Sequence, residues 1–119
     1  MIAPKGSCPV ISVPHMKGGE GEMIQEHLVS AAEMGGAGRL FARAVLKPGC
    51  SVGSHTHQGD MEVCYFLSGR GIVVEDGRET AVSAGDLNVV RAGENHEIRN
   101  PGPEDLVYLA VVLFPNGKP

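Results

Sequence analysis

Aromatic residues are scarce in this chain of 119 residues. It contains no tryptophan, two tyrosines and three phenylalanines. Aliphatic side chains, alanine and methionine must therefore fill most of its core. With 42% hydrophobic and 20% charged residues, the chain is too apolar to be disordered. Its length suits one hydrophobic core, so we expect a single compact domain.

The sequence also lacks a basic cluster and a long apolar run. Ten Lys and Arg stand against fourteen Asp and Glu, a net charge of -4, which disfavours nucleic-acid binding through phosphates. The longest apolar run, residues 107–114, is far shorter than the ~18 residues that span a bilayer. Because the first residues hold no hydrophobic signal segment, we expect a cytoplasmic protein without a membrane partner.

Cysteine is the third scarce residue. Cys8, Cys50 and Cys64 are odd in number and form no C-x-x-C pair. This pattern argues against both a disulfide framework and a zinc knuckle.

Glycine and proline, in contrast, are abundant, with 17 and 8 residues. From residue 40 onwards, turn signals such as Asp76-Gly77 interrupt short apolar runs roughly every 8 to 12 residues, as in an all-β sandwich or barrel. The strands that this spacing predicts are residues 40–47, 54–57, 62–67, 71–75, 79–82, 87–90, 96–99 and 106–114.

The N-terminal part has a different character. Residues 1–21 contain three prolines and a Gly-Gly-Glu-Gly run, which predicts an arm lying on the surface or on a partner subunit. The barrel domain is then residues 22–119. Residues 22–29 fit either a helix or a strand, and we favour the strand. Residues 30–34 predict one capped helical turn, closed by two glycines.

Polar side chains that suit a metal ion occur at two points of the predicted barrel. His55 and His57 are alternate residues of an expected strand, so both imidazoles point to one face. A turn after His57 can bring Glu62 beside them, and His96 begins a strand that can deliver a third imidazole. Two or three imidazoles and a carboxylate can bind a divalent transition metal and leave positions open for a ligand.

The spacing of these residues resembles the motifs of the cupin superfamily. The first family motif, G-x5-H-x-H-x4-E-x6-G, matches at every named position from Gly49 to Gly69. The second, G-x5-P-x-G-x2-H-x3-N, matches except that Arg91 stands where the family usually has proline. Its matching residues are Gly85, Gly93, His96 and Asn100.

The resemblance covers residues 40–114 and implies a cupin-type double-stranded β-helix, a jelly-roll barrel of six to eight strands preceded by the N-terminal arm. It implies one divalent ion per chain, Mn, Fe, Ni or Zn. It also implies a homodimer, because small cupins commonly exchange N-terminal strands or pack their sheets together. The implied metal ligands are His55, His57, Glu62 and His96.

A divalent ion with three neutral imidazoles and one carboxylate has a net charge near +1 and attracts anions. We therefore expect a metalloenzyme of the dioxygenase, decarboxylase or isomerase type that acts on a small anionic or chelating substrate. The scarcity of aromatic residues favours a small polar ligand held by the metal over a large one held by stacking.

Other functions are compatible with the same motifs. A non-catalytic cupin that binds or senses a small ligand or metal is the alternative, because no second acid or base stands out near the motifs. Glu62 disfavours a thiol dioxygenase, since that branch of the superfamily lacks the motif glutamate. The intact ligand set disfavours a metal-free sugar epimerase of the same architecture.

Three more side chains have two interpretations each. Arg91, near the barrel mouth, could bind a carboxylate or phosphate of the ligand, or be an ordinary surface residue. Arg43 could face the lumen or the solvent, because its alanine neighbours leave the parity of the strand undecided. Cys64 is a small packed thiol or, since it shares the parity of Glu62, faces the metal cavity.

Overall fold

In the computed structural model, residues 1–117 are described, and they form ten β-strands and one short 3-10 turn. The bounds are β1 (Val10–Pro14), η1 (Met16–Gly18), β2 (Glu22–His27), β3 (Gly38–Leu46), β4 (Ser51–Thr56), β5 (Met61–Ser68), β6 (Arg70–Glu75), β7 (Arg78–Ser83), β8 (Leu87–Val90), β9 (Asn95–Arg99) and β10 (Leu106–Leu113). Within these residues, no helix has the length and apolar character needed to cross a membrane.

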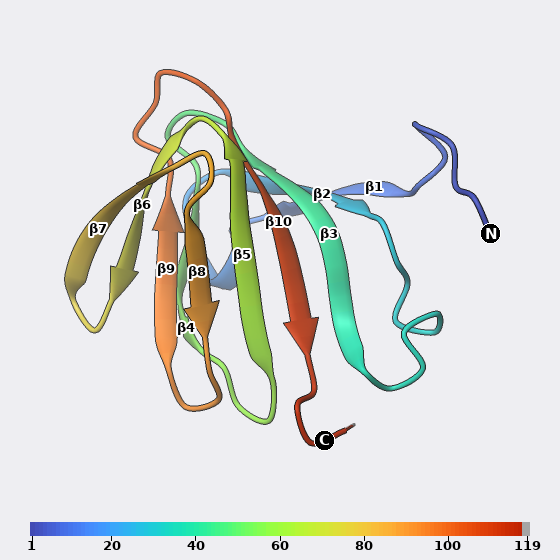
Figure 1. The fold of residues 1–119 in the computed structure, drawn as a ribbon. Coiled ribbons are helices and arrows are strands. Elements are labelled where there is room, and N and C mark those ends of the chain that lie inside the picture. The colour runs from blue at the N-terminus through green and yellow to red at the C-terminus, as the bar shows by residue number, and fades with distance from the viewer. Residues whose placement is uncertain (118–119) are drawn as a thin grey trace.

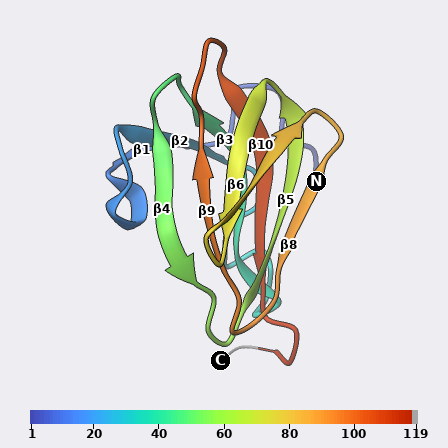
Figure 2. The same ribbon diagram turned by 90° about the vertical axis from the view of Figure 1, so that its left-hand side faces the viewer.

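The strands form two antiparallel sheets that face each other. The larger sheet has the order β1-β2-β3-β10-β5-β8, and the smaller has the order β4-β9-β6-β7. Figure 2 shows β4, β9 and β6 in front of β3, β10 and β5. The predicted all-β architecture is therefore confirmed. Strands β3 to β10 correspond one by one to the eight that the turn spacing predicts, with ends that differ by a few residues.

The core lies between the two sheets. In β5, alternation turns Cys64 and Phe66 inwards and leaves Tyr65 exposed. The ring of Phe66 lies 5.3 Å from that of Tyr108 on β10. Aliphatic residues such as Ile98 on β9 complete this core, as the lack of tryptophan predicts.

Two tight turns form as the sequence predicts. Asp76 and Gly77 both have positive φ, 50° and 78°, and connect β6 to β7. In the expected capped turn, the Ser30 amide donates to the Glu33 carboxylate at 2.8 Å, and the Glu33 amide donates to the Ser30 hydroxyl at 3.1 Å. This reciprocal capping box stabilises the turn, and Gly35 and Gly36, both with positive φ, end it.

The N-terminal segment contributes directly to the fold. Within residues 1–21, β1 pairs with β2 at the edge of the larger sheet, and both strands extend towards the N-terminus in Figure 1. The turn η1 packs on β4 through two glycines. A side chain on Gly19 would collide with the backbone of Ser51, and one on Gly53 with that of Lys17. This close backbone contact fixes η1 beside β4.

Candidate metal centre

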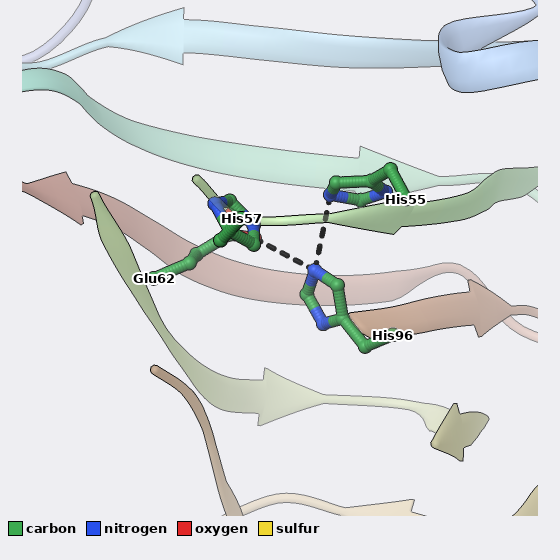
Figure 3. Close-up of side chains that lie close together, drawn as sticks. All are labelled: His55, His57, Glu62 and His96. Atoms are coloured by element: carbon green, nitrogen blue, oxygen red, sulfur yellow. Dashed lines mark hydrogen bonds and ion pairs between the residues drawn. The ribbon is translucent and has the colours of Figure 1, made fainter. Parts of the chain in front are cut away.

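Four polar side chains from both sheets meet inside the barrel. His55 lies on β4, His57 directly follows that strand, Glu62 lies on β5 and His96 lies on β9. In the strand register, His55 pairs with His96. One ligand atom from each of the four residues lies within 4.8 Å of the others. Figure 3 shows the three rings and the carboxylate directed towards one another.

The Nε2 atoms of two imidazoles contact one oxygen of Glu62, and the third contacts Nε2 of His96. Oε1 of Glu62 lies 3.0 Å from Nε2 of His57 and 2.8 Å from Nε2 of His96. Nε2 of His96 in turn lies 3.2 Å from Nε2 of His55. The centre of the cluster is therefore made of three ring nitrogens and a carboxylate oxygen.

The other nitrogen of each ring is engaged outside the cluster. Nδ1 of His55 lies 2.8 Å from the Gly53 carbonyl, and Nδ1 of His57 lies 2.8 Å from Oδ1 of Asp60. A carbonyl or carboxylate oxygen only accepts, so in the neutral imidazoles Nδ1 carries the hydrogen and Nε2 keeps its lone pair.

The third imidazole is oriented in the same way by an amide. Nδ1 of His96 lies 2.8 Å from Oδ1 of Asn88, whose Nδ2 donates to Glu75 at 3.3 Å. With its nitrogen turned to Glu75, Asn88 presents its oxygen to the ring. All three imidazoles thus direct lone pairs towards the same point.

This arrangement has the chemistry of a cation site. His57, Glu62 and His96 are buried, at 3%, 7% and 0% exposure, so bulk water does not compete with an ion for their lone pairs. Without an ion, an imidazole that also carries a hydrogen on Nε2 donates it to Glu62. Burial alone would raise the pKa of Glu62, but these hydrogen bonds from His57 and His96 outweigh it and lower the pKa to about 2. The hydrogen bond to Glu62 raises the pKa of His57, and burial lowers that of His55. Three nitrogens and one carboxylate oxygen suit a divalent first-row transition ion.

The cluster opens into a cavity of about 60 Å³ between the sheets. Its walls are mainly apolar and include Met23, Leu40 and Ile98. Two basic residues, Lys17 of η1 and Arg39 of β3, also line it. The space suits an ion and a ligand of a few non-hydrogen atoms.

The structure resolves the three ambiguous side chains. The Arg91 side chain is 73% exposed, 4.0 Å from Glu94, and is not part of the cavity lining. Arg43 is exposed while its alanine neighbours are buried, so it points away from the lumen. Cys64 is fully buried in the hydrophobic core and is not part of the cavity lining, so it is a packed thiol. Burial and the nearby Glu62 raise the pKa of this thiol well above the ordinary value.

The sequence motifs do not predict four residues that contribute to the site: Lys17, Arg39, Asp60 and Asn88. Asp60 alone carried a local signal, because it follows His57 by three residues in the turn before β5. Strand pairing and the packing of η1 on β4 bring Arg39 and Lys17 to the cavity and Asn88 to Nδ1 of His96.

Comparisons with known proteins agree with this geometry. The Cupin domain family matches residues 42–112, and the chain belongs to this family. It is 43% identical over 102 residues to an oxalate-binding protein of Thermotoga maritima, an alignment that spans 86% of this chain and 84% of the relative.

Solved structures extend the comparison to the fold. A Thermotoga maritima crystal structure described as a predicted oxalate decarboxylase has a TM-score of 0.91 and 38% identity, covering 96% of this chain and 99% of its own. A Cupin 2 conserved barrel domain protein of Salinispora arenicola has a TM-score of 0.73 and 24% identity, covering 95% of this chain and 87% of its own. The predicted double-stranded β-helix is therefore confirmed.

Proposed function

We propose that this protein binds one divalent transition metal ion per chain and, at that ion, a small chelating dicarboxylate of the oxalate class. The observation that carries the proposal is that three Nε2 atoms and one carboxylate oxygen lie within 4.8 Å of one another, with every Nδ1 atom held by an outside partner. The ion itself would supply positive charge and coordination positions for the ligand oxygens. The ligands in this proposal are His55, His57, Glu62 and His96.

The size and charge of the cavity support a small anionic ligand. About 60 Å³ of space is too little for a sugar or an aromatic acid beside an ion. Lys17 and Arg39 add positive charge to a lining that is otherwise mainly apolar. The name of the oxalate-binding relative, at 43% identity, indicates the same ligand class.

The cavity favours binding over decarboxylation. Cleaving the C–C bond of hydrogen oxalate releases CO2 and requires a proton at the remaining carbon to give formate. Among the described residues that line the cavity, Glu62 is the only carboxylic acid, and it is a proposed metal ligand. Burial raises the pKa of Tyr108 well above its ordinary value, which makes its hydroxyl a poor proton donor. Apart from the four proposed metal ligands, the lining thus offers no carboxylic acid or imidazole to donate this proton.

The test begins with protein purified without a nickel column. Elemental analysis should find close to one transition ion per chain, and calorimetry should detect oxalate binding to the loaded protein and none to the metal-free protein. His57→Ala should lose the ion and with it the oxalate binding. Arg78→Ala, at an exposed position of β7, is the control. Full metal occupancy in His57→Ala would contradict the proposed ligand set.

The same preparation decides between binding and catalysis. Loaded with each candidate metal, it is incubated with oxalate and assayed for CO2, formate and oxygen uptake. We expect bound oxalate to be recovered intact. Turnover that disappears in His57→Ala would overturn the binding function in favour of a metalloenzyme.

We also infer a homodimer in the cytoplasm, formed through the outer face of the larger sheet. Strand pairing aligns Arg43, Leu109, Tyr65 and Leu87 in one row across β3, β10, β5 and β8. Tyr65 and Leu87 are 43% and 58% exposed, and Leu67 nearby is 40% exposed. Contiguous exposed apolar side chains on a sheet favour a partner surface, and the sheet packing of small cupins favours a second copy.

A further inference from the structure

Arg39 has an unusual position at the wall of the metal cavity. Its Nε atom donates to Oδ2 of Asp60 at 2.9 Å, and among residues 1–117 this is the one hydrogen bond of its guanidinium group. Arginine has five N–H donors, so four remain for another partner. The Arg39 side chain is 48% exposed and lines the cavity, which leaves these donors accessible to a ligand.

Asp60 holds this guanidinium in a defined place. Its carboxylate is 9% exposed and uses one oxygen for Arg39 and the other for Nδ1 of His57. Arg39 is therefore fixed relative to a proposed metal ligand. A planar guanidinium held at one edge presents its other nitrogens as a fork suited to carboxylate oxygens.

The charges around the cavity do not cancel when an ion is bound. A divalent ion with Lys17 and Arg39 gives four positive charges, and Asp60 with Glu62 gives two negative charges. Lys17 takes part in none of the ion pairs found among residues 1–117. The excess of two positive charges matches a dianion and leaves a monoanion incompletely balanced.

We propose that Arg39 is the residue that selects a dianionic ligand, with Lys17 adding charge at the same cavity. This inference rests on the proposed function. When a dicarboxylate chelates the ion, one oxygen of each carboxylate binds the ion. The other oxygen of each carboxylate stays free and carries part of the negative charge. The free N–H groups of Arg39 bind these oxygens. An analogue with an amide in place of one carboxylate has only one such free oxygen for Arg39.

The test compares oxalate with oxamate, which has nearly the same size but a single negative charge. Calorimetry is performed on metal-saturated wild type, Arg39→Gln and Arg39→Lys, with Arg78→Gln, at an exposed position of β7, as the control. Wild type should prefer oxalate by at least about tenfold. In Arg39→Gln, oxalate binding should weaken by about ten- to a hundredfold and oxamate binding by less than about threefold. Arg39→Lys keeps the charge without the fork, so its loss should be smaller.

The metal affinity of every variant is measured separately, because Arg39 also contacts Asp60 beside His57. An oxalate-to-oxamate ratio in Arg39→Gln equal to that of wild type would overturn the role of Arg39 and leave the proposed function intact. Wild-type protein that binds metal but neither ligand would overturn both. Arg39→Lys provides the same comparison if Arg39→Gln does not fold.

Discussion

Nδ1 of His57 lies 2.8 Å from Oδ1 of Asp60, and both side chains are buried. The remaining oxygen of Asp60 accepts from Arg39, so neither carboxylate oxygen is left without a partner. Because the carboxylate accepts from Nδ1, it fixes the tautomer that turns Nε2 of His57 to the centre of the site. Asp60 is thus a positioning residue for a proposed ligand.

Replacing Asp60 by Asn should lower metal affinity by about ten- to a hundredfold. The amide is a weaker acceptor and has lost the charge that stabilises Arg39. Competition with a fluorescent chelator measures the affinity of folded protein. Asp105→Asn serves as the control, because Asp105 is exposed. Equal affinities in Asp60→Asn and wild type would show that the imidazole is oriented without this carboxylate.

Asn100, the last residue of the second motif, has a structural role. Its Nδ2 donates to the carbonyls of Leu46 and Glu104, both at 2.7 Å, and its Oδ1 accepts from the Gly102 amide at 2.8 Å. The residue is 2% exposed. Asn100→Ala should lower the free energy of unfolding by about 3 kcal/mol, because three hydrogen bonds are lost, one of them buried and two partly buried.

Urea denaturation measures this loss, with the exposed Asn116→Ala as the control. The metal affinity of folded Asn100→Ala should stay within about twofold of wild type, since Asn100 is not among the cavity-lining residues. A variant with unchanged stability and weakened metal binding would instead place Asn100 in the site.

The sequence predicts those features of the fold that depend on residues close together in the chain. Alternation and glycine turns are properties of neighbouring residues, which is why every strand from β3 to β10 is anticipated. The meeting of His55 and His96 is implied by the two family motifs, each of which contains one of these histidines. The strand β1 escaped prediction because proline and glycine dominate its surroundings, and its pairing with β2 supplies what local propensity does not.

The outer parts of the site depend on long-range placement. Arg39 and Asp60 are 21 residues apart, and nothing in either neighbourhood predicts their contact. Lys17 reaches the cavity because η1 packs closely on β4 at Gly19 and Gly53. In the sequence, nothing distinguishes these two glycines from ordinary loop residues. The parity of Arg43 could not be decided because alanines on both sides fit an inner or an outer face equally well.

Metal affinity should decrease as the pH falls from about 8 to about 5.5. The ion binds unprotonated imidazoles, so protons compete with it below the pKa of each ring. In metal-free protein, the hydrogen bond to Glu62 raises the pKa of His57, which makes this competition begin at a higher pH than for a free imidazole. Glu62, with a pKa of about 2, stays ionised throughout this range.

Each proton displaced should change the affinity by about tenfold per pH unit. Competition titrations at several pH values give this slope directly. Asp60→Asn removes a second group that raises the pKa of His57, so the decline should begin at lower pH in that variant. Affinity that is constant over the whole range would exclude the imidazoles as ligands.

Tyr65 provides a test of the inferred dimer that leaves the metal site untouched. It points outwards from β5 and pairs with Leu109 and Leu87 in the apolar row of the larger sheet. Tyr65→Asp places a charge on this face and should weaken self-association by at least about a hundredfold, because desolvating an unpaired carboxylate at an interface is costly. Sedimentation over a concentration series measures it. Thr80→Asp, on an exposed position of β7, should stay dimeric with wild-type metal affinity. A wild-type chain that sediments as a monomer at all concentrations would refute the inferred dimer.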